Sequence, residues 1–431
     1  MVWDGGQIGG GWAMTACGLD FGTSNTTLGV QDAAGGFRLL ALDGPRTTLP
    51  TAVFFDFEAD AVTIGQAAVD SYVSGVEGRL MRSIKSMLGT DLIDADTALR
   101  KGRISFRAVI GTFLDTVKRR AEATLGAELG DVVVGRPVHF VDGDPAGDAA
   151  AEETLGAIAR AAGFRNVSFQ FEPIAAALDY EQRVTGEELA LIADIGGGTS
   201  DFSVVRIGPE RRGKPDRSAD ILANDGIRVG GTDFDRDFSL ATAMPELGHG
   251  SALKRAGLLA PKSVYFDLAT WSKINFLYTT KALAELERLM RDSAVPEKIE
   301  RLIGIVEHRQ GHALAMAVER AKIALSDHAE TQLALDWGEG SLALPVDVPG
   351  LNRATGLLAA RIGNRIRDCL ADAGVTPDRI DAVFLTGGST LLPQVRAAIL
   401  AEAPDARVVE GNIFGSVGLG LTVEAQRRYG G

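Results

Sequence analysis

Cysteine is scarce in this sequence of 431 residues, and the two that occur, Cys17 and Cys369, show no metal-ligand spacing. A disulfide framework is therefore not expected, and we expect two buried thiols in a reducing cytoplasm. Basic residues are also in deficit, because Lys and Arg number 44 against 57 Asp and Glu, for a formal net charge of -13. This balance argues against non-specific binding to nucleic acid or to an anionic membrane.

Long apolar runs are missing as well, and no stretch reaches the ~20 apolar residues of a membrane span. Residues 1–13 lack the basic start and the apolar centre of a secretory signal. We expect them to be a disordered N-terminal extension with no fold of its own. The P-loop and the dinucleotide fingerprint are also absent from the glycine-rich segments, so any phosphate site must be of another type.

The most informative stretch, residues 191–205, reads L-I-A-D-I-G-G-G-T-S-D-F-S-V-V. It predicts a buried strand, a glycine turn and a second strand. Consecutive glycines let backbone N–H groups crowd around an anion, and a phosphate chain is the natural candidate. Asp194 and Asp201 flank the turn, and carboxylates beside a polyphosphate favour a hard cation such as Mg²⁺ between them.

The same pattern occurs near the start of the chain, where residues 17–30 read C-G-L-D-F-G-T-S-N-T-T-L-G-V. Asp20 corresponds in place to Asp194, and each is followed by a glycine and hydroxyl turn. This repetition predicts one supersecondary unit used twice. Two such hairpins, each at the head of its own sheet, could hold a phosphate chain from both sides of a cleft.

Two charged residues outside these hairpins have ordinary structural interpretations when taken alone. Lys85 falls in R-L-M-R-S-I-K-S-M-L-G at 79–89, within a stretch expected to be helical, where a lysine usually snorkels to the surface. Glu172 precedes Pro173 at the entrance of a predicted helix, where a carboxylate is favoured by the helix dipole.

The second half of the chain predicts a large helical segment followed by another glycine step. Residues 236–330 are expected to be largely helical, with apolar stripes that are most simply core. Residues 332–348 alternate enough to be strands, and residues 353–373 are helical. Residues 382–393 read A-V-F-L-T-G-G-S-T-L-L-P, which predicts strand, glycine turn and helix.

These pieces, in this order, resemble the actin, sugar-kinase and heat-shock ATPase superfamily, and within it most closely the DnaK-type heat-shock chaperones. The resemblance spans about residues 17–423. It is carried by six motifs: G-L-D-F-G-T-S-N at 18–25, F-E-P-I-A-A-A at 171–177, D-I-G-G-G-T-S-D at 194–201, V-G-G-T-D-F-D at 229–235, E-R-A-K at 319–322 and L-T-G-G-S-T at 385–390.

The resemblance implies an α/β, actin-like ATPase fold. Two lobes, each with a duplicated ribonuclease-H-like βαβ core, would hold the nucleotide in the cleft between them. Lobe I would cover residues 14–190, with residues 53–107 as the inserted subdomain IB. Lobe II would cover residues 191–431, with residues 232–350 as the inserted, largely helical subdomain IIB.

The resemblance also implies roles for individual residues, with ATP or ADP and Mg²⁺ as ligands. Asp20 and Asp194 would hold hydrated Mg²⁺, and Lys85, Glu172, Thr199 and Asp201 would serve hydrolysis by water. Pro137 would relay the nucleotide state. The remaining expected nucleotide contacts are Gly22, Thr23, Ser24, Asn25, Gly196, Gly197, Gly198, Gly230, Gly231, Glu319, Lys322, Ile323, Gly387, Gly388, Ser389 and Leu391.

The sequence departs from the family pattern at the adenine end. Ile323 and Leu391 stand where the family usually has the two arginines that sandwich the base, and the Phe414 region replaces a common acidic residue. Cation–π contacts of ~0.5–2 kcal/mol each are lost, so we expect looser nucleotide binding or an altered base preference. The chain is also short, which implies a form without the family's peptide-binding domain.

The leading hypothesis is a Mg²⁺-dependent, heat-shock-type ATPase that relays its nucleotide state to a protein partner. The distinctive helical segment at 251–311 is the candidate partner surface. The alternatives are a non-catalytic nucleotide-sensing scaffold and a small-molecule kinase on the same fold. The scaffold is disfavoured by the retained site residues, and no motif for a kinase substrate pocket is found. The retained residues are Asp20, Lys85, Glu172, Asp194, Thr199 and Asp201.

Overall fold

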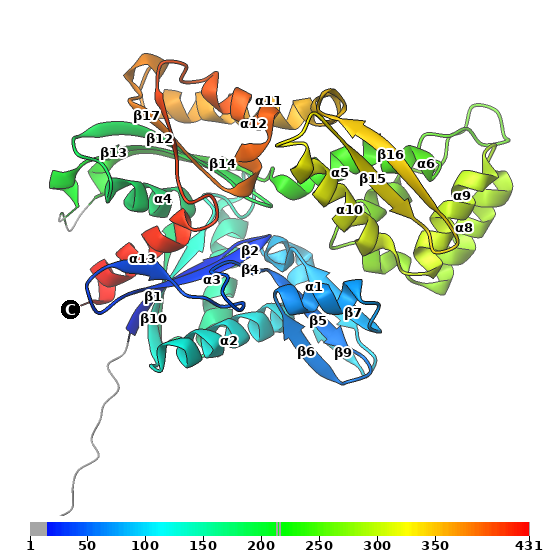
Figure 1. Cartoon of the computed structure of the whole chain (residues 1–431), viewed down its shortest axis with the longest axis horizontal. Helices are drawn as coiled ribbons and strands as arrows, with labels where there is room; N and C mark the ends of the chain where they lie inside the picture. The colour runs from blue at the N-terminus through cyan, green and yellow to red at the C-terminus, as the bar shows by residue number, and fades with distance from the viewer. Residues whose placement is uncertain (1–14, 213, 215–216, 431) are drawn as a thin grey trace, which may run out of the picture.

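A computed structural model describes residues 15–212, 214 and 217–430, arranged as two sheet-centred halves with an inserted subdomain on each (Figure 1). The extension expected at residues 1–13 lies outside the described residues. Cys17 and Cys369 are both buried free thiols, as expected. Within the described ranges, no helix is both long and apolar enough to cross a membrane.

The first half is built on a six-stranded sheet with the order β11-β10-β1-β2-β3, to which β4 is added beside β2. Its central strand β1 runs parallel to β10 and antiparallel to β2, its hairpin partner. The strands are β1 (Thr15–Phe21), β2 (Asn25–Gln31), β3 (Phe37–Leu39), β4 (Leu49–Pro50), β10 (Leu129–Arg136) and β11 (Asn166–Phe171).

The second half repeats this plan in a five-stranded sheet with the order β14-β13-β12-β17-β18. Strand β12 again runs antiparallel to its hairpin partner β13 and parallel to β17. The repeated unit expected from the sequence is therefore present in both sheets. The strands are β12 (Glu188–Ile195), β13 (Ser200–Ile207), β14 (Ile221–Ile227), β17 (Ala382–Thr386) and β18 (Arg407–Glu410).

Two helices, α4 (Glu172–Glu181) and α13 (Ser416–Tyr429), lie between the sheets and join the halves (Figure 1). They approach so closely that a Cβ on Gly420 would lie 1.6 Å from the carbonyl oxygen of Ala175. Their apolar faces share one buried cluster with strands of both sheets. The outer faces carry α2 (Phe106–Leu125), α3 (Pro145–Ala161), α11 (Val348–Asp372) and α12 (Pro393–Leu400).

The insertion in the first half is a small sheet with a covering helix. Its elements are β5 (Ala52–Asp56), β6 (Ala61–Ile64), α1 (Gln66–Val73), β7 (Gly78–Arg82), β8 (Asp96–Ala98) and β9 (Arg103–Ser105), with the 3₁₀ helices η1 (Ile84–Met87) and η2 (Asp91–Asp94). The helix expected across residues 79–89 is wrong. Residues 78–82 pair with β5, and burial of Leu80 and Met81 in that sheet outweighs their helical propensity.

The insertion in the second half is largely helical, as expected, and ends in a β-hairpin. Its apolar stripes, including Leu286, Leu289, Ile299 and Leu302, are buried in one core with the second sheet. The elements are α5 (Gly231–Ala241), α6 (Ala243–Glu246), α7 (Ser263–Leu268), η5 (Ile274–Leu277), α8 (Thr280–Asp292), α9 (Pro296–Glu307), α10 (Gly311–Ala324), β15 (Glu330–Asp336) and β16 (Ser341–Asp347).

Three short 3₁₀ turns, η3 (Pro209–Arg211), η4 (Ser218–Asp220) and η6 (Pro377–Arg379), connect elements of the second sheet, and η7 (Gly388–Leu391) follows β17. We call the two halves lobe I and lobe II. Their limits at 14–190 and 191–431, and those of subdomains IB at 53–107 and IIB at 232–350, are kept as a proposed division.

Candidate functional site

The turns of the two repeated hairpins touch each other where the lobes face. A Cβ added to Gly197 would lie 2.2 Å from Oγ of Ser24, and one on Gly198 would lie 2.7 Å from Oγ1 of Thr23. A side chain at either position would force the Ser24 or Thr23 hydroxyl to rotate away or the turns to separate. Glycine therefore permits this close approach, and it also exposes backbone N–H groups.

A third glycine turn supports the lobe II hairpin from behind. The Gly231 N–H donates to the Gly196 carbonyl at 2.9 Å, and the Thr232 N–H donates to the Gly197 carbonyl at 2.8 Å. A Cβ on Gly230 would lie 2.5 Å from the backbone nitrogen of Gly198. Gly230 thus packs against the back of the turn, where it fixes the hairpin, whereas Gly231 faces the cavity.

Lys85 and Glu172 form a buried ion pair across lobe I. The Nζ atom of Lys85 donates to Oε1 of Glu172 at 2.5 Å, and both residues are buried. The surface interpretation of Lys85 is therefore wrong. Glu172 is the first residue of α4, as the Pro173 signal predicts, and its carboxylate is directed to Lys85.

Three aspartates are buried near this pair, and their environment raises the pKa of each. Burial, and then the Glu172 charge, raise the pKa of Asp20 to about 7 and that of Asp201 to about 7. The same two causes raise the pKa of Asp194 well above its ordinary value. Burial alone would lower the pKa of Lys85, but Glu172 and Asp20 outweigh it and raise that pKa. The cluster thus carries more buried negative than positive charge.

This excess of carboxylates suits a divalent cation of the hard class, which prefers oxygen donors. The Asp20 and Asp194 carboxylates both line the cavity. Among the described residues, no group of three or more acidic, His or Cys side chains is arranged to hold an ion directly. A Mg²⁺ ion at Asp20 and Asp194 would therefore retain most of its water, in keeping with its slow dehydration.

Asp201 connects the hairpin to the loop that follows β10. Its Oδ1 accepts from the Val138 N–H at 2.6 Å, directly after Pro137. The Thr199 hydroxyl donates to the same carboxylate, which opposes the rise in the Asp201 pKa. In the β12–β13 pair, Asp201 lies opposite Asp194. A conformational change at the hairpin turn can thus be transmitted to the Pro137 loop through the hydrogen bond from the Val138 N–H to Asp201.

The far end of the cavity carries two ion pairs. Lys322 lies 2.8 Å from Oδ1 of Asp235 and donates to the Gly231 carbonyl at 3.1 Å. Burial raises the pKa of Asp235 to about 6, against the opposing effect of Lys322. Glu319 pairs with Arg82, which reaches it from β7 of lobe I.

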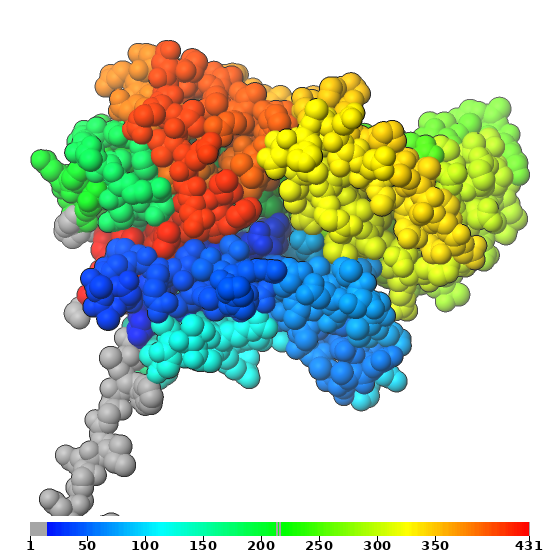
Figure 2. Space-filling view, viewed as in Figure 1, coloured from blue at the N-terminus to red at the C-terminus, as the bar shows by residue number. Residues whose placement is uncertain are grey.

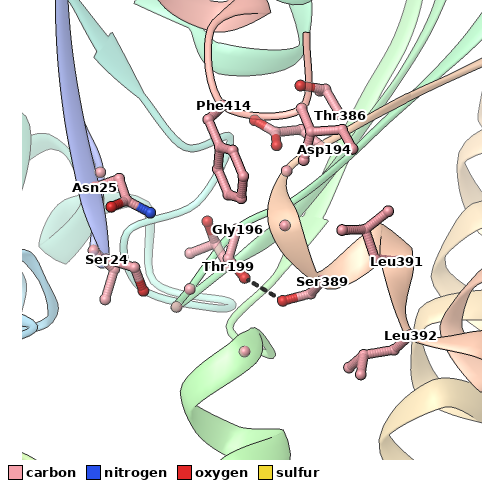
Figure 3. Close-up of a pocket in the computed structure, with 18 of the residues that line it drawn as sticks. Ser24, Asn25, Asp194, Gly196, Thr199, Thr386, Ser389, Leu391, Leu392 and Phe414 are labelled. Atoms are coloured by element: carbon pink, nitrogen blue, oxygen red, sulfur yellow. Dashed lines mark hydrogen bonds between the residues drawn. The ribbon is translucent and has the colours of Figure 1, made fainter. Parts of the chain in front are cut away.

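Apolar side chains form the wall around this end (Figure 3). Ile323 is 55% exposed and Leu391 is 42% exposed, so both present apolar surface to a ligand. Phe414 projects into the pocket, and a Cβ on Gly388 would lie 2.9 Å from its ring. Below it, the Ser389 hydroxyl donates to the Gly196 carbonyl at 3.1 Å, which ties this wall to the hairpin.

Most of the residues expected from the sequence line a single cavity of about 250 Å³. Gly230 lies behind it, and Asp201 is only 1% exposed beside Lys85 and Glu172. The predicted residues that line the cavity are Asp20, Gly22, Thr23, Ser24, Asn25, Lys85, Glu172, Asp194, Gly196, Gly197, Gly198, Thr199, Gly231, Glu319, Lys322, Ile323, Gly387, Gly388, Ser389 and Leu391.

Two charged groups at this site, Arg82 and Asp235, were not singled out from the sequence. Asp235 belongs to the V-G-G-T-D-F-D motif, so the motif itself offered a signal. Arg82 lies three residues before Lys85, but its partner Glu319 is 237 residues away. No local pattern signals that contact.

Comparison with known proteins gives one family and several relatives. The family model described as "Hsp70 protein" matches residues 16–241 and 298–404. The chain is 26% identical to the chaperone protein DnaK of Thermosipho melanesiensis over 421 residues, which cover 95% of this chain and 58% of that protein. It is also 26% identical to an HscA chaperone homolog of Chromobacterium violaceum, over 89% of this chain and 54% of the relative. The chain thus spans little more than half the length of either relative.

Proposed function

Because this chain belongs to the Hsp70 family, we propose that it binds ATP with Mg²⁺ in the cavity between its lobes and hydrolyses it. The observation that carries the proposal is the meeting of both glycine hairpins beside the buried Lys85–Glu172 pair. This arrangement offers backbone N–H donors for a phosphate chain, a cation for its terminal group and carboxylates for a hydrated metal.

Catalysis would depend on positioning and charge rather than on a covalent intermediate. Bound Mg²⁺ would neutralise charge on the phosphate chain, with Asp20 and Asp194 holding its water shell. Lys85 would contact the terminal phosphate. Glu172 and Asp201 would order the attacking water.

At the other end, Glu319 and Lys322 would reach the ribose and the base. Both already have ion-pair partners, Arg82 and Asp235, which hold their side chains at the cavity wall. Ile323 and Leu391 would pack on the purine by apolar contact. Since apolar contact lacks the cation–π contribution of an arginine, nucleotide would be held more loosely than by the arginine pair.

Nucleotide entry would require the lobes to part. A cavity of about 250 Å³ is smaller than the roughly 300–1,000 Å³ typical of small-molecule sites. The Arg82–Glu319 pair spans the two lobes at this cavity. Opening and closing of the cleft would therefore be coupled to breaking and forming this pair.

The nucleotide state would reach a partner protein through lobe movement and through the Asp201–Val138 hydrogen bond beside Pro137. The candidate surface is the helical segment at 251–311. Residues 242–297 fall outside the residues matched by the family model, so most of this segment lies outside that match. It also exposes four large apolar side chains, Leu258, Leu259, Phe266 and Phe276.

A second candidate is a non-catalytic, nucleotide-sensing scaffold, favoured by Ile323 and Leu391 at the adenine wall. Phosphate release from Mg·ATP separates the two. The ATPase releases phosphate in proportion to enzyme concentration, and release stops when EDTA removes Mg²⁺. Nucleotide binding with no release of phosphate would contradict the ATPase and leave the scaffold.

A further inference from the structure

A second and larger cavity, of about 580 Å³, lies between subdomains IB and IIB and away from the hairpin turns. Figure 2 shows the light-blue atoms of IB in contact with the yellow-green atoms of IIB, and the cavity lies along this junction. One wall comes from residues 57–100 and the other from residues 275–320. We call it the basic cavity because of the four arginines that line it: Arg79, Arg100, Arg309 and Arg320.

These arginines are poorly matched by carboxylates, although the Arg320 charge helps that of Arg82 to lower the pKa of Glu319 against the effect of burial. None of the four forms an ion pair with any residue that the structure describes, and Glu77 is the only acidic side chain among the described lining residues. By contrast, Arg82 on the same strand as Arg79 is paired with Glu319. In a chain with a formal charge of -13, this cavity is a local excess of positive charge, with four arginines against one glutamate.

Arg79 is the most constrained member of the group. Its guanidinium donates to the Ala98 carbonyl at 2.9 Å, but its buried Nε has no hydrogen-bond partner among the described residues. Burial, and then the charges of Arg309 and Arg103, lower the pKa of Arg79 to about 10. Leaving the buried Nε donor unpaired costs free energy, and so does holding the Arg79 charge beside other arginines. An anion in the cavity would accept a hydrogen bond from the guanidinium and offset the positive charge.

The two walls are already joined by one tyrosine contact, and a second tyrosine braces the IIB wall. The Tyr72 hydroxyl of IB donates to the Arg309 carbonyl of IIB at 2.8 Å. On the IIB side, the Gly311 N–H donates to the Tyr278 hydroxyl at 3.0 Å. Arg309 itself has a left-handed backbone with φ of 53°, a conformation uncommon for a non-glycine residue. An anion held by both walls would therefore add to an existing link between the lobes.

We propose that the basic cavity binds a small phosphate-bearing anion, which bridges Arg79 of IB and Arg309 and Arg320 of IIB. A guanidinium group binds phosphate well because two of its coplanar N–H groups can donate to two phosphate oxygens at once. Apolar lining from Val76, Leu99 and Met316 leaves room for an organic substituent on the phosphate. The bound anion favours the closed arrangement of the lobes.

Calorimetric titration of the full chain with pyrophosphate and with phenyl phosphate, in Mg²⁺-free buffer, tests this proposal. Arg309 and Arg320 are both exposed, so Arg309→Gln and Arg320→Gln leave the core intact. Each variant is expected to weaken binding by about tenfold, as loss of one charged hydrogen bond implies. The matched control Arg255→Gln removes the same charge from an exposed IIB residue outside the cavity and leaves binding unchanged.

Added ADP separates the two sites, because it displaces pyrophosphate from the nucleotide site, and the pyrophosphate that still binds reports the basic cavity. Pyrophosphate binding that survives in Arg309→Gln and Arg320→Gln at wild-type strength overturns the proposal. If Arg255→Gln weakens pyrophosphate binding as much as the cavity variants do, the proposal is also overturned, since binding would then depend only on the net charge of the protein. Binding of a glutamate-rich peptide without binding of either phosphate would instead assign the cavity to a protein partner. None of these results depends on ATP hydrolysis, so a failure here is distinct from a failure of the proposed ATPase.

Discussion

Arg82 and Glu319 form a two-pronged ion pair across the cleft, with Nη1 to Oε2 at 2.7 Å and Nη2 to Oε1 at 3.2 Å. The Arg82 guanidinium also lies 4.5 Å from the ring centroid of Trp271. Burial would raise the pKa of Glu319, but the Arg82 charge and hydrogen bond outweigh it and lower that pKa. The pair joins β7 of lobe I to α10 of lobe II at the place where a nucleotide would enter.

Arg82→Gln is expected to speed release of ADP by roughly tenfold, because a charged, paired hydrogen bond contributes about 1.5 kcal/mol or more to the closed form. Stopped-flow displacement of a fluorescent ADP analogue measures this rate. The control is Arg119→Gln, which removes an exposed arginine from an ion pair within α2. Slower release from Arg82→Gln would contradict a role for this ion pair in holding the cleft closed, and would mean that the freed Glu319 holds the ribose better.

Lys85→Ala is expected to abolish turnover while nucleotide binding persists, because in the proposed mechanism Lys85 would supply the cation for the terminal phosphate. The change leaves Glu172 buried without its partner, which costs about 3–5 kcal/mol of stability. Phosphate release and the melting curve should therefore be measured on the same sample. A folded variant with unchanged turnover would remove Lys85 from the mechanism.

Ile323→Arg and Leu391→Arg are expected to tighten ATP binding, since each adds a guanidinium beside the purine. A cation–π contact of ~0.5–2 kcal/mol corresponds to an affinity gain of roughly 2- to 30-fold per substitution. Calorimetry with Mg·ATP measures the gain, and Ile323→Gln serves as the polar, uncharged control. If the arginine variants bind no better than Ile323→Gln, the apolar wall does not contact the base.

We expect His139 to make the stability of the Pro137 loop depend on pH. Its ring lies 3.7 Å from Asp225 and 3.6 Å from Asp148, and the Asp225 hydrogen bond raises its pKa above the ordinary 6.5 despite partial burial. The protonated His139 ring stabilises the folded protein fully below pH 6.5, and this stabilisation is lost as the pH rises through the raised pKa of His139. The charged groups around the ring are Asp148, Asp201 and Asp225, with Arg136 and Arg365 paired to two of them.

His139→Gln should therefore melt about 1 °C below the wild type at pH 6 and together with it at pH 9, because the pair is partly exposed and weak. Differential scanning fluorimetry across this range checks the trend. If the difference in melting temperature between His139→Gln and the wild type grew as the pH rose, the protonated His139 ring would not be the stabilising form.

The sequence was most informative where a local pattern repeats. The glycine turns after Asp20 and Asp194 predicted two hairpins, and both are present at equivalent places in the two sheets. The helical insertion and the strand before Gly387 were also predicted, since their apolar periodicity is set by nearby residues. Local pattern thus determines the elements that carry the candidate site.

Contacts between distant segments could not be predicted in this way. Residues 79–82 read as helix, but they form β7 because β5 offers them a partner strand. Lys85 read as a surface lysine, but Glu172, 87 residues later, binds it in the interior. The Arg82–Glu319 pair depends on how the two lobes meet, and that relationship follows from tertiary packing rather than from any local spacing.

Calorimetric titration of the full chain with ATP, with and without Mg²⁺, tests the central claim most directly. We expect saturable binding at the site between the hairpins with a dissociation constant below about 1 mM, and at least tenfold weaker binding when EDTA removes the metal. No detectable binding at millimolar Mg·ATP, or binding of equal strength without Mg²⁺, would contradict the proposed nucleotide site between the two hairpins.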